Sequence, residues 1–170
     1  MDTALPVSVI ICTYNRADRL CLALEALQKQ TLPQDQFEVI VVDNASTDDT
    51  QEVCNRYLTQ LSNLHYHYES IQGLSRARNQ GLEVAKGRIA AYLDDDAIPS
   101  PQWLQALLQG FETIEPEPVA VGGAILPLWE VAPPVWMHRY VQGYYTVLDF
   151  GSVPRWFPPG EFPYGADRPC

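Results

Sequence analysis

The sequence predicts an α/β protein with a doubly wound, mostly parallel sheet. Short apolar runs rich in Val and Ile recur along the chain, and amphipathic segments with helical spacing separate them. Runs with little polar alternation are typical of strands buried on both faces, as in a parallel sheet. Strands that alternate with helices build such sheets, and their ligands bind outside the carboxyl ends of the strands.

The bulk composition indicates one cytosolic domain. The chain has 170 residues, of which 46% are hydrophobic, enough for one substantial core. A net charge of -10 argues against binding to nucleic acid or anionic lipid, because both require a basic face. The four cysteines lack metal or disulfide spacing, and no apolar run is long enough to span a bilayer. We expect a cytoplasmic protein, free or peripheral to the cytoplasmic face of a membrane, with no oligomeric state indicated.

Four runs in the first part of the chain predict strands, and a fifth follows later. The strands are expected at residues 7–12, 37–42, 64–69, 88–93 and 118–126. Leu20, Leu24 and Leu27 recur at helical spacing between the first two strands, so this segment predicts a helix. Asn15, with Asp18 three residues later, is the expected cap of that helix.

Three later helices are predicted from the residues at their ends. Ser46 followed by Asp49 is expected to open the second helix as a capping pair. Gly87 should close the third helix in a left-handed conformation, which glycine adopts without strain. Ser100 and Pro101 should form the cap and first turn of the fourth, because proline is tolerated at the first helical position.

The character of the sequence changes at residue 127. Residues 127–170 contain eight prolines and three tryptophans and show no clear hydrophobic period. Such a segment predicts long loops, suited to the floor or lid of a cleft. We therefore divide the chain into a core at residues 1–126 and an irregular, Pro- and aromatic-rich tail at residues 127–170.

Three polar groups follow the first, second and fourth predicted strands. They are Thr13-Tyr14-Asn15, Asp43-Asn44 and Asp94-Asp95-Asp96. Right-handed crossovers bring the ends of parallel strands to one edge of the sheet, so we expect these groups to converge. Taken singly, each group is also explained by the local hydrogen bonds that turns require.

The acidic triplet, residues 94–96, points to a cation. Adjacent carboxylates repel one another, which raises their pKa values unless a positive charge neutralises them. Oxygen ligands without His or Cys favour Mg²⁺ or Mn²⁺, which bind through one or two carboxylates together with a substrate diphosphate. The alternative is a solvated acidic turn ahead of the fourth helix.

Two further sets of residues have both a functional and a plain interpretation. Arg76 and Arg78 stand near the start of the third helix, just after Gly73, where they could meet phosphate oxygens. They could equally be surface arginines, because residues two apart on a helix do not face one ligand. For His65 and His67, which alternate within a predicted strand, an exposed sheet face is favoured over a metal pair.

Four segments in this order resemble family-2 glycosyltransferases of the Rossmann-like GT-A fold. They are Val-Ser-Val-Ile-Ile-Cys-Thr-Tyr-Asn-Arg, Val-Val-Asp-Asn-Ala-Ser-Thr-Asp, Gly-Leu-Ser-Arg-Ala-Arg-Asn-Gln-Gly and Leu-Asp-Asp-Asp-Ala. The resemblance covers about residues 7–126, which it identifies as a nucleotide-sugar-binding core. Residues 163–166 look like the start of an acceptor-side stretch, so the tail would begin the acceptor-side region.

The resemblance implies an inverting, metal-dependent transfer of a sugar from a UDP-, dTDP- or GDP-linked donor to a saccharide or lipid-linked saccharide. In that family pattern Asp94 and Asp96 form the DxD motif, with Asp96 on the Mn²⁺ or Mg²⁺ ion and Asp94 on the ribose or, through water, on the metal. The remaining residues implied to surround the donor are Thr13, Tyr14, Asn15, Asp43, Asn44 and Asp95, with Arg76 or Arg78 on the diphosphate.

The resemblance leaves open the nucleobase of the donor and the catalytic base on the acceptor side. Many relatives carry a second aspartate where Asn44 stands, at a position that accepts a hydrogen bond from uracil. The nucleobase of the donor is therefore not fixed. A catalytic base should lie beyond the DxD motif, where Asp149, Glu161 and Asp167 are the late candidates. We therefore expect donor binding with weak or no transfer.

Two alternatives to a glycosyltransferase remain on the sequence alone. One is a truncated, non-catalytic nucleotide-binding domain that keeps the donor fold. The other is a phosphohydrolase of the haloacid dehalogenase type, whose DxDx(T/V) motif residues 94–98 superficially resemble. Ile98 lacks the hydroxyl of threonine, and that motif normally follows the first strand.

Overall fold

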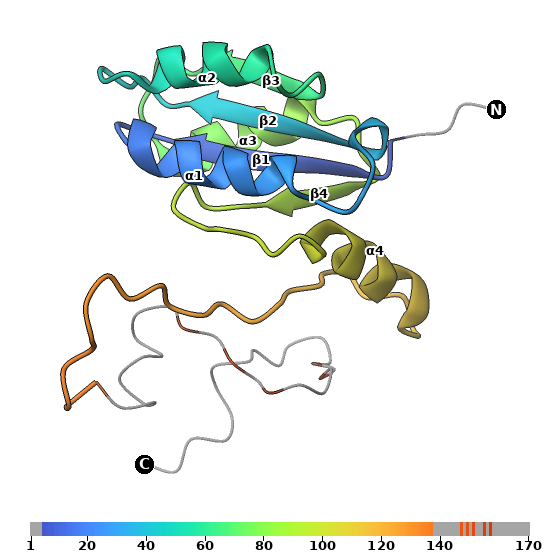
Figure 1. Ribbon diagram of the computed structural model, residues 1–170. Helices are drawn as coiled ribbons and strands as arrows, with labels where there is room; N and C mark the ends of the chain where they lie inside the picture. Colours follow the sequence, from blue (N-terminus) through green and yellow to red (C-terminus); the bar gives the residue numbers. More distant parts are fainter. Residues whose placement is uncertain are drawn as a thin grey trace. The chain divides into compact units, whose positions relative to one another are not determined.

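The computed structural model describes residues 5–137 and residues 147, 149, 151, 155 and 157 (Figure 1). The chain divides into two units, residues 1–119 and residues 120–170. The helices and strands described below all belong to the first unit. Within the described residues, no helix is both long and apolar enough to cross a membrane.

The first unit is built on a four-stranded, all-parallel sheet in the order β3-β2-β1-β4. The strands are β1 (Val7–Thr13), β2 (Phe37–Asp43), β3 (Leu64–Tyr68) and β4 (Ile89–Tyr92). β1 and β2 are buried on both faces along almost their whole length, as their unbroken apolar runs predict. β4 is an edge strand with alternating burial. The predicted parallel α/β fold is confirmed.

Helices cover both faces of the sheet. They are α1 (Ala17–Gln28), α2 (Thr50–Leu58), α3 (Leu74–Val84) and α4 (Trp103–Thr113), with a short 3-10 turn, η1 (Gln34–Gln36). α3 packs against β1 and β2, whereas α1 packs with α2 on the other side of the sheet (Figure 1). The sheet is therefore doubly wound, as predicted.

The core lies between the sheet and these helices. Leu20, Leu24 and Leu27 of α1 are fully buried, in agreement with their helical spacing. On the opposite face, the side chains of Ile10 and Ile40 form a cluster with others from β2 and α3. Because such interiors are close-packed, the strand ends that carry the polar groups are held in fixed positions.

The cap predicted for α1 is wrong. Asn15 does not cap the helix, and Arg16 stands at the N-cap position without a side-chain cap hydrogen bond. The free backbone N–H of Ala17 instead donates to Asp48 Oδ2 at 3.1 Å. The capping carboxylate thus comes from a segment distant in sequence, which local spacing cannot reveal.

The start of α2 also differs from the prediction. The helix begins at Thr50, and neither Ser46 nor Asp49 makes a side-chain cap hydrogen bond. Asp48 Oδ1 accepts the backbone N–H of Thr50 at 3.1 Å, so one carboxylate serves the first turns of two helices. The Ser46 hydroxyl oxygen instead accepts a hydrogen bond from the Asn15 N–H in the loop that follows β1.

Gly87 does not adopt the predicted left-handed conformation, and α3 already ends at Val84. A β-carbon at Gly87 would collide with the backbone at Val7 and Ser8 of β1. The Gly87 N–H donates to Ser8 Oγ at 2.7 Å. The glycine is therefore required by a close approach of two chain segments rather than by a helix cap.

The segment before α4 docks this helix instead of capping it. The helix begins at Trp103, after the predicted start at Ser100 and Pro101. The carbonyl oxygens of Ser100 and Pro101 accept hydrogen bonds from Gln30 Nε2 and the Thr31 N–H, at 2.8 and 2.7 Å. These bonds fix α4 against the loop that follows α1.

The strand predicted at residues 118–126 is wrong. In the described part of this segment the only β-type residue is an isolated bridge at Ile125. Val119 is fully exposed, and nothing lies near Gly122 or Gly123. A strand requires a neighbour for its backbone hydrogen bonds, and this segment straddles the boundary between the two units.

The two histidines of β3 are half-buried rather than exposed. His65 Nε2 lies 3.4 Å from Glu38 Oε2, and Glu38 is buried. Ser8 Oγ donates to Glu38 Oε1 at 2.6 Å. Burial lowers the pKa of His67. This network braces the sheet near the start of its central strands, away from the polar groups that follow the strands.

Candidate functional site

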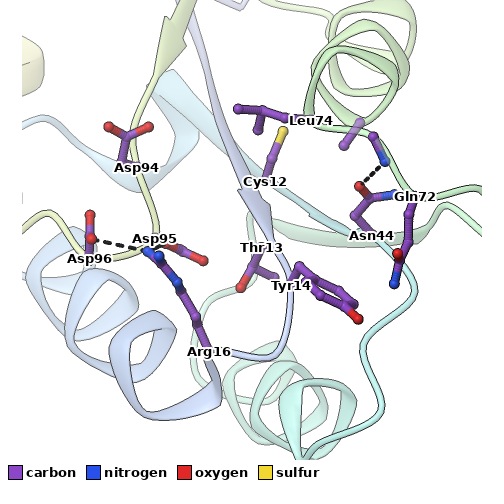
Figure 2. Close-up of a pocket in the computed structure, with 12 residues that line it drawn as sticks. Cys12, Thr13, Tyr14, Arg16, Asn44, Gln72, Leu74, Asp94, Asp95 and Asp96 are labelled. Carbon is purple, nitrogen blue, oxygen red and sulfur yellow. Dashed lines mark hydrogen bonds and ion pairs between the residues drawn. The ribbon is translucent and has the colours of Figure 1, made fainter.

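The topology creates a crevice at the carboxyl end of β1. The strand order reverses between β1 and β4, and ligands of open α/β sheets bind at such switch points. A pocket of about 500 Å³ lies there (Figure 2). It is lined by Cys12, Thr13, Tyr14, Arg16, Asn44, Gln72, Gly73, Leu74, Ala77, Asp94, Asp95 and Asp96. The sheet thus brings together residues that follow all four strands.

The loop after β1 forms the centre of the pocket. Thr13 is 2% exposed, and its Oγ1 makes no well-formed hydrogen bond among the described residues. It nevertheless lies close enough to the Asp95 carboxyl to oppose the rise in the pKa of that group. A buried hydroxyl without a well-formed hydrogen bond costs free energy. The Tyr14 ring is largely exposed beside it, where it offers a flat apolar face (Figure 2).

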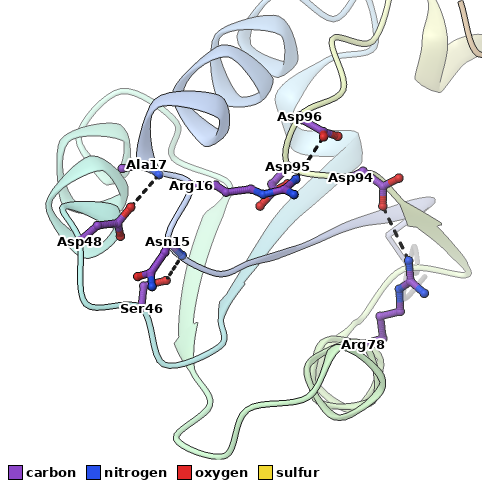
Figure 3. Close-up of polar contacts among 9 residues, drawn as sticks. All are labelled: Asn15, Arg16, Ala17, Ser46, Asp48, Arg78, Asp94, Asp95 and Asp96. Atoms are coloured by element: carbon purple, nitrogen blue, oxygen red, sulfur yellow. Dashed lines mark hydrogen bonds and ion pairs between the residues drawn. The ribbon is translucent and has the colours of Figure 1, made fainter. Parts of the chain in front are cut away.

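Asn15 lies outside the pocket lining and joins two loops. Its backbone is left-handed, with φ 52°. Its Oδ1 accepts the Thr47 N–H at 2.7 Å, and its own N–H donates to Ser46 Oγ at 3.0 Å (Figure 3). The loops after β1 and β2 are therefore held together by reciprocal hydrogen bonds.

Asp43 lies beneath the pocket wall rather than in it. The residue is buried, and its Oδ1 accepts the Ser46 N–H at 2.8 Å. Its Oδ2 accepts the Tyr66 hydroxyl at 2.8 Å. Burial and this bond to the carboxylate raise the pKa of Tyr66. Both oxygens of Asp43 thus support the loop after β2.

Asn44 shapes the opposite wall. Its Oδ1 accepts the Gly73 N–H at 2.7 Å, and its Nδ2 donates to the Ile71 carbonyl at 2.9 Å. Gly73 has φ 153°, a conformation that L side chains rarely adopt. The amide of Asn44 therefore fixes the turn that carries Gln72 into the pocket lining (Figure 2).

The three carboxylates of the acidic triplet sit in different surroundings. The Asp94 side chain is exposed and lies 3.7 Å from Arg78 Nη2, whereas that of Asp95 is 8% exposed. Burial raises the pKa of Asp95, and the Thr13 hydroxyl and Arg16 guanidinium oppose this rise. Asp96 is half-exposed and pairs with Arg16 (Figure 3).

Neither predicted helix arginine lines the pocket. Arg76 is exposed on α3. Arg78 reaches Asp94, and its guanidinium lies 5.9 Å from the centroid of the Tyr92 ring. Sequence reasoning missed Arg16, although it directly follows the polar group after the first strand. It also missed Gln72, which no sequence pattern marks.

Cys12 is another lining residue that sequence reasoning did not single out. Burial raises the pKa of its thiol to about 11, so the thiol is protonated near neutral pH. A protonated thiol is a poor metal ligand and a poor nucleophile. Cys12 therefore contributes apolar surface to the pocket.

The donor set fits a divalent cation only if the ligand completes the coordination. Among the described residues there is no group of three or more His, Cys, Asp or Glu that could hold a metal. Asp94 and Asp96 nevertheless expose carboxylates at the pocket, and Mg²⁺ or Mn²⁺ is commonly bound by one or two carboxylates plus substrate phosphates.

Of the three late carboxylates, the structure describes Asp149 alone. Asp149 belongs to the second unit, where its Oδ1 accepts the Gly151 N–H at 2.8 Å. Glu161, Asp167 and the stretch at residues 163–166 lie outside the described residues. The catalytic base therefore stays a sequence-based expectation.

Similar proteins share this core. The glycosyltransferase AglE of Haloferax volcanii is 42% identical over 128 residues, which cover 74% of this chain and 41% of AglE. Validoxylamine A glucosyltransferase of Streptomyces hygroscopicus subsp. jinggangensis is 36% identical over 118 residues, covering 68% of this chain and 28% of that protein. The chain thus spans less than half the length of these relatives.

Two solved structures are similar to part of the chain. S. aureus TarS 1-349 in complex with UDP has a TM-score of 0.60 at 31% identity, covering 63% of this chain and 32% of that chain. The mannosyltransferase PcManGT from Pyrobaculum calidifontis, in complex with GDP-Man and Mn²⁺, has a TM-score of 0.54 at 34% identity, covering 59% and 30%. Residues 8–159 match the family described as Glycosyl transferase family 2. With a parallel α/β core and its polar strand ends in one pocket, the chain belongs to glycosyl transferase family 2.

Proposed function

We propose that this chain binds a nucleoside diphosphate sugar in the pocket at the end of β1 and is the donor-binding part of an inverting glycosyltransferase. The observation that carries the proposal is the pocket itself, where the exposed Tyr14 ring and three adjacent carboxylates converge at the carboxyl end of β1. UDP in the TarS structure and GDP-Man with Mn²⁺ in PcManGT support this ligand class.

Each wall of the pocket has a distinct role in this proposal. The Tyr14 ring stacks on the base, and Thr13 and Asp94 contact the ribose. Asn44 and Asp43 hold the loops around the base in place, since their polar atoms are already engaged within the protein. Arg16, the arginine in the pocket lining, lies on the side that would face the diphosphate, because guanidinium groups match phosphate oxygens.

A divalent cation belongs to the same proposal. Asp96 would hold it, with Asp94 beside it, and the bound Mg²⁺ or Mn²⁺ would offset negative charge on the departing diphosphate. The transfer also needs a base that takes the proton of the attacking hydroxyl, and we expect it from the acceptor side. The saccharide or lipid-linked acceptor would be bound by the acceptor-side region that begins at residue 127.

Isothermal titration calorimetry tests donor binding directly. We expect the chain to bind at least one of UDP, dTDP and GDP in the presence of Mn²⁺, and Asp96→Ala to weaken that binding strongly. Asp35→Ala, which removes an exposed carboxylate of η1, is the matched control and should bind as the unchanged chain does. A chain that ignores all three nucleotides with Mn²⁺ present contradicts the proposal.

The sequence-based alternatives give different results in simple assays. A non-catalytic nucleotide-binding domain would bind the donor without releasing nucleoside diphosphate from it, whereas a transferase hydrolyses its donor slowly even without acceptor. A phosphohydrolase would turn over an aryl phosphate. The family match and the position of the triplet after β4, not after β1, give the phosphohydrolase no support.

A further inference from the structure

A side chain of this protein acts as the counterion of the acidic triplet. Arg16 Nη1 lies 3.2 Å from Asp95 Oδ1 and 3.1 Å from Asp96 Oδ2, so one guanidinium nitrogen bridges two carboxylates (Figure 3). The charge that the adjacent carboxylates need is therefore supplied from within the chain. Figure 2 shows this guanidinium inside the pocket wall, next to both acids.

The two ion pairs of Arg16 differ in their exposure to water. The side chain of Asp95 is 8% exposed, so its pair is partly shielded and is expensive to break. The Asp96 side chain is 53% exposed and that of Arg16 is 54% exposed, so water and ions reach their pair. Exposed pairs contribute little free energy, and the Arg16–Asp96 pair is therefore the one that exchanges easily.

Asp96 is also the carboxylate assigned to the divalent cation in the proposed function. A guanidinium and a divalent cation repel each other, so Arg16 on Asp96 weakens the attraction of that carboxylate for a metal. Arg16 stands at the N-cap of α1 with non-helical backbone angles, and its guanidinium has several N–H donors. The Arg16 guanidinium can thus keep its ion pair with Asp95 while its other N–H groups turn toward the pocket.

We propose that Arg16 is an exchangeable counterion that occupies Asp96 while no metal is bound, yields it to the divalent cation, and then binds the diphosphate of the donor. This inference rests on the proposed function. It assigns Arg16 two opposite effects: it competes with the metal alone, and it strengthens the binding of the nucleotide once the metal is present. Through this exchange, metal binding becomes coupled to nucleotide binding.

Calorimetry on the full chain separates these two effects. The variants are Arg16→Gln, Arg16→Lys and, as the matched control, Arg88→Gln, which removes an equally exposed arginine paired with Glu117 outside the pocket. One arm titrates Mn²⁺ alone. The other titrates UDP and GDP separately with Mn²⁺ at saturation. Thermal unfolding checks that each variant is folded.

We expect Arg16→Gln to tighten the binding of Mn²⁺ alone by about twofold to fivefold, the range of an exposed ion pair. The same variant should weaken the binding of UDP or GDP in the presence of Mn²⁺ by at least as much. Arg16→Lys keeps the charge but not the fork of donors, so it should shift both affinities in the same directions and by less. Arg88→Gln should change neither.

Changes of opposite sign are the signature that a merely structural arginine does not produce. The inference is overturned if Arg16→Gln leaves Mn²⁺ affinity unchanged, or if it weakens both ligands together. If Arg16→Gln does not fold, Arg16→Lys with unaltered affinities overturns it equally. When the unchanged chain binds UDP or GDP with Mn²⁺ but the variants match it, only the inference about Arg16 fails. When the unchanged chain binds neither nucleotide, the proposed function fails as well.

Discussion

At the scale of single residues, the sequence located the polar strand ends but not their partners. Thr13, Asn44 and the triplet do line one pocket, as the convergence argument predicts. The Asn44 amide forms hydrogen bonds with the backbone at Ile71 and Gly73. The sequence does not predict these bonds, because the partners belong to a later loop. Arg16 was missed for the same reason, since its acidic partners lie far along the sequence.

Replacing Thr13 with Val should separate stability from binding. Without a ligand, the buried Oγ1 lacks a well-formed hydrogen bond, so its removal should raise the free energy of unfolding by up to about 1 kcal/mol. Nucleotide affinity with Mn²⁺ should fall by up to about tenfold, because the ligand loses a hydrogen bond. Urea unfolding and calorimetry measure the two effects.

Thr59→Val is the control for this experiment, because Thr59 is exposed and its hydroxyl donates to the Arg56 carbonyl near the end of α2. It should leave nucleotide affinity unchanged. An unaltered affinity in Thr13→Val would show that the hydroxyl at position 13 does not meet the ligand.

The Asp48 carboxylate should stabilise the fold in a pH-dependent way. Its pKa is lowered from the ordinary value of 3.8, because hydrogen bonds from Thr50 and Ala17 outweigh the effect of burial. A lowered folded-state pKa gives stability that is present above the unfolded value and lost as the pH falls below it. Asp48→Ala should therefore cost about 1 kcal/mol near neutral pH and less in acid.

Urea unfolding at about pH 7 and about pH 3 measures this difference, because about pH 3 lies below the ordinary carboxyl pKa of 3.8, where part of this stability is already lost. Asp49→Ala is the matched control, since its neighbouring carboxylate makes no side-chain cap hydrogen bond. An equal loss of stability for Asp48→Ala at both pH values would contradict the prediction.

At the scale of elements, apolar periodicity placed the strands and helices, whereas their ends were set by contacts between segments. β1, β2 and β3 fall where the apolar runs predict them. The start of α1 and the end of α3 differ from the prediction: Asp48 binds the first turn of α1, and Ser8 binds Gly87 in the segment after α3. A strand can be predicted only when the strand that would pair with it can also be predicted. For residues 118–126 no such neighbour was identified, and the predicted strand is wrong.

Gly81→Ala should push α3 away from the sheet. A β-carbon at Gly81 would lie 2.5 Å from Ile10 Cγ2, and Ile10 is buried in the core and cannot yield. Overpacking costs about 1–3 kcal/mol, more than the roughly 1 kcal/mol that alanine gains in a helix. Chemical denaturation should show a net loss of stability.

The control for this change is Gly122→Ala, because no atom lies within 4 Å of a β-carbon there. Its midpoint of unfolding should stay close to that of the unchanged chain. A Gly81→Ala protein of greater stability would mean that Ile10 can repack without strain.

At the scale of the whole molecule, the parallel doubly wound fold follows from the alternation of apolar runs and amphipathic segments. The order of the strands does not follow from it, since the placement of β4 beside β1 depends on how α3 crosses the sheet. That placement is what brings the triplet next to Thr13 and Arg16. Among the residues that the structure describes, those that line the pocket belong to the first unit.

Residues 1–119 should therefore fold and bind nucleotide without the rest of the chain. The sheet, its helices and the described residues of the pocket lining lie within this unit. We expect a cooperative unfolding transition and the same affinity for UDP or GDP with Mn²⁺ as in the full chain. Loss of binding in a folded fragment would show that residues 120–170 contribute to the donor site.

The reciprocal hydrogen bonds of Asn15 have a practical consequence for recombining family members. Since Asn15 both accepts from Thr47 and donates to Ser46, the loops after β1 and β2 form one transplantable module. A chimera that receives only one of these loops leaves donors and acceptors of the other unmatched, whereas a chimera that receives both keeps them paired. Libraries for altered donor preference should therefore exchange the two loops together.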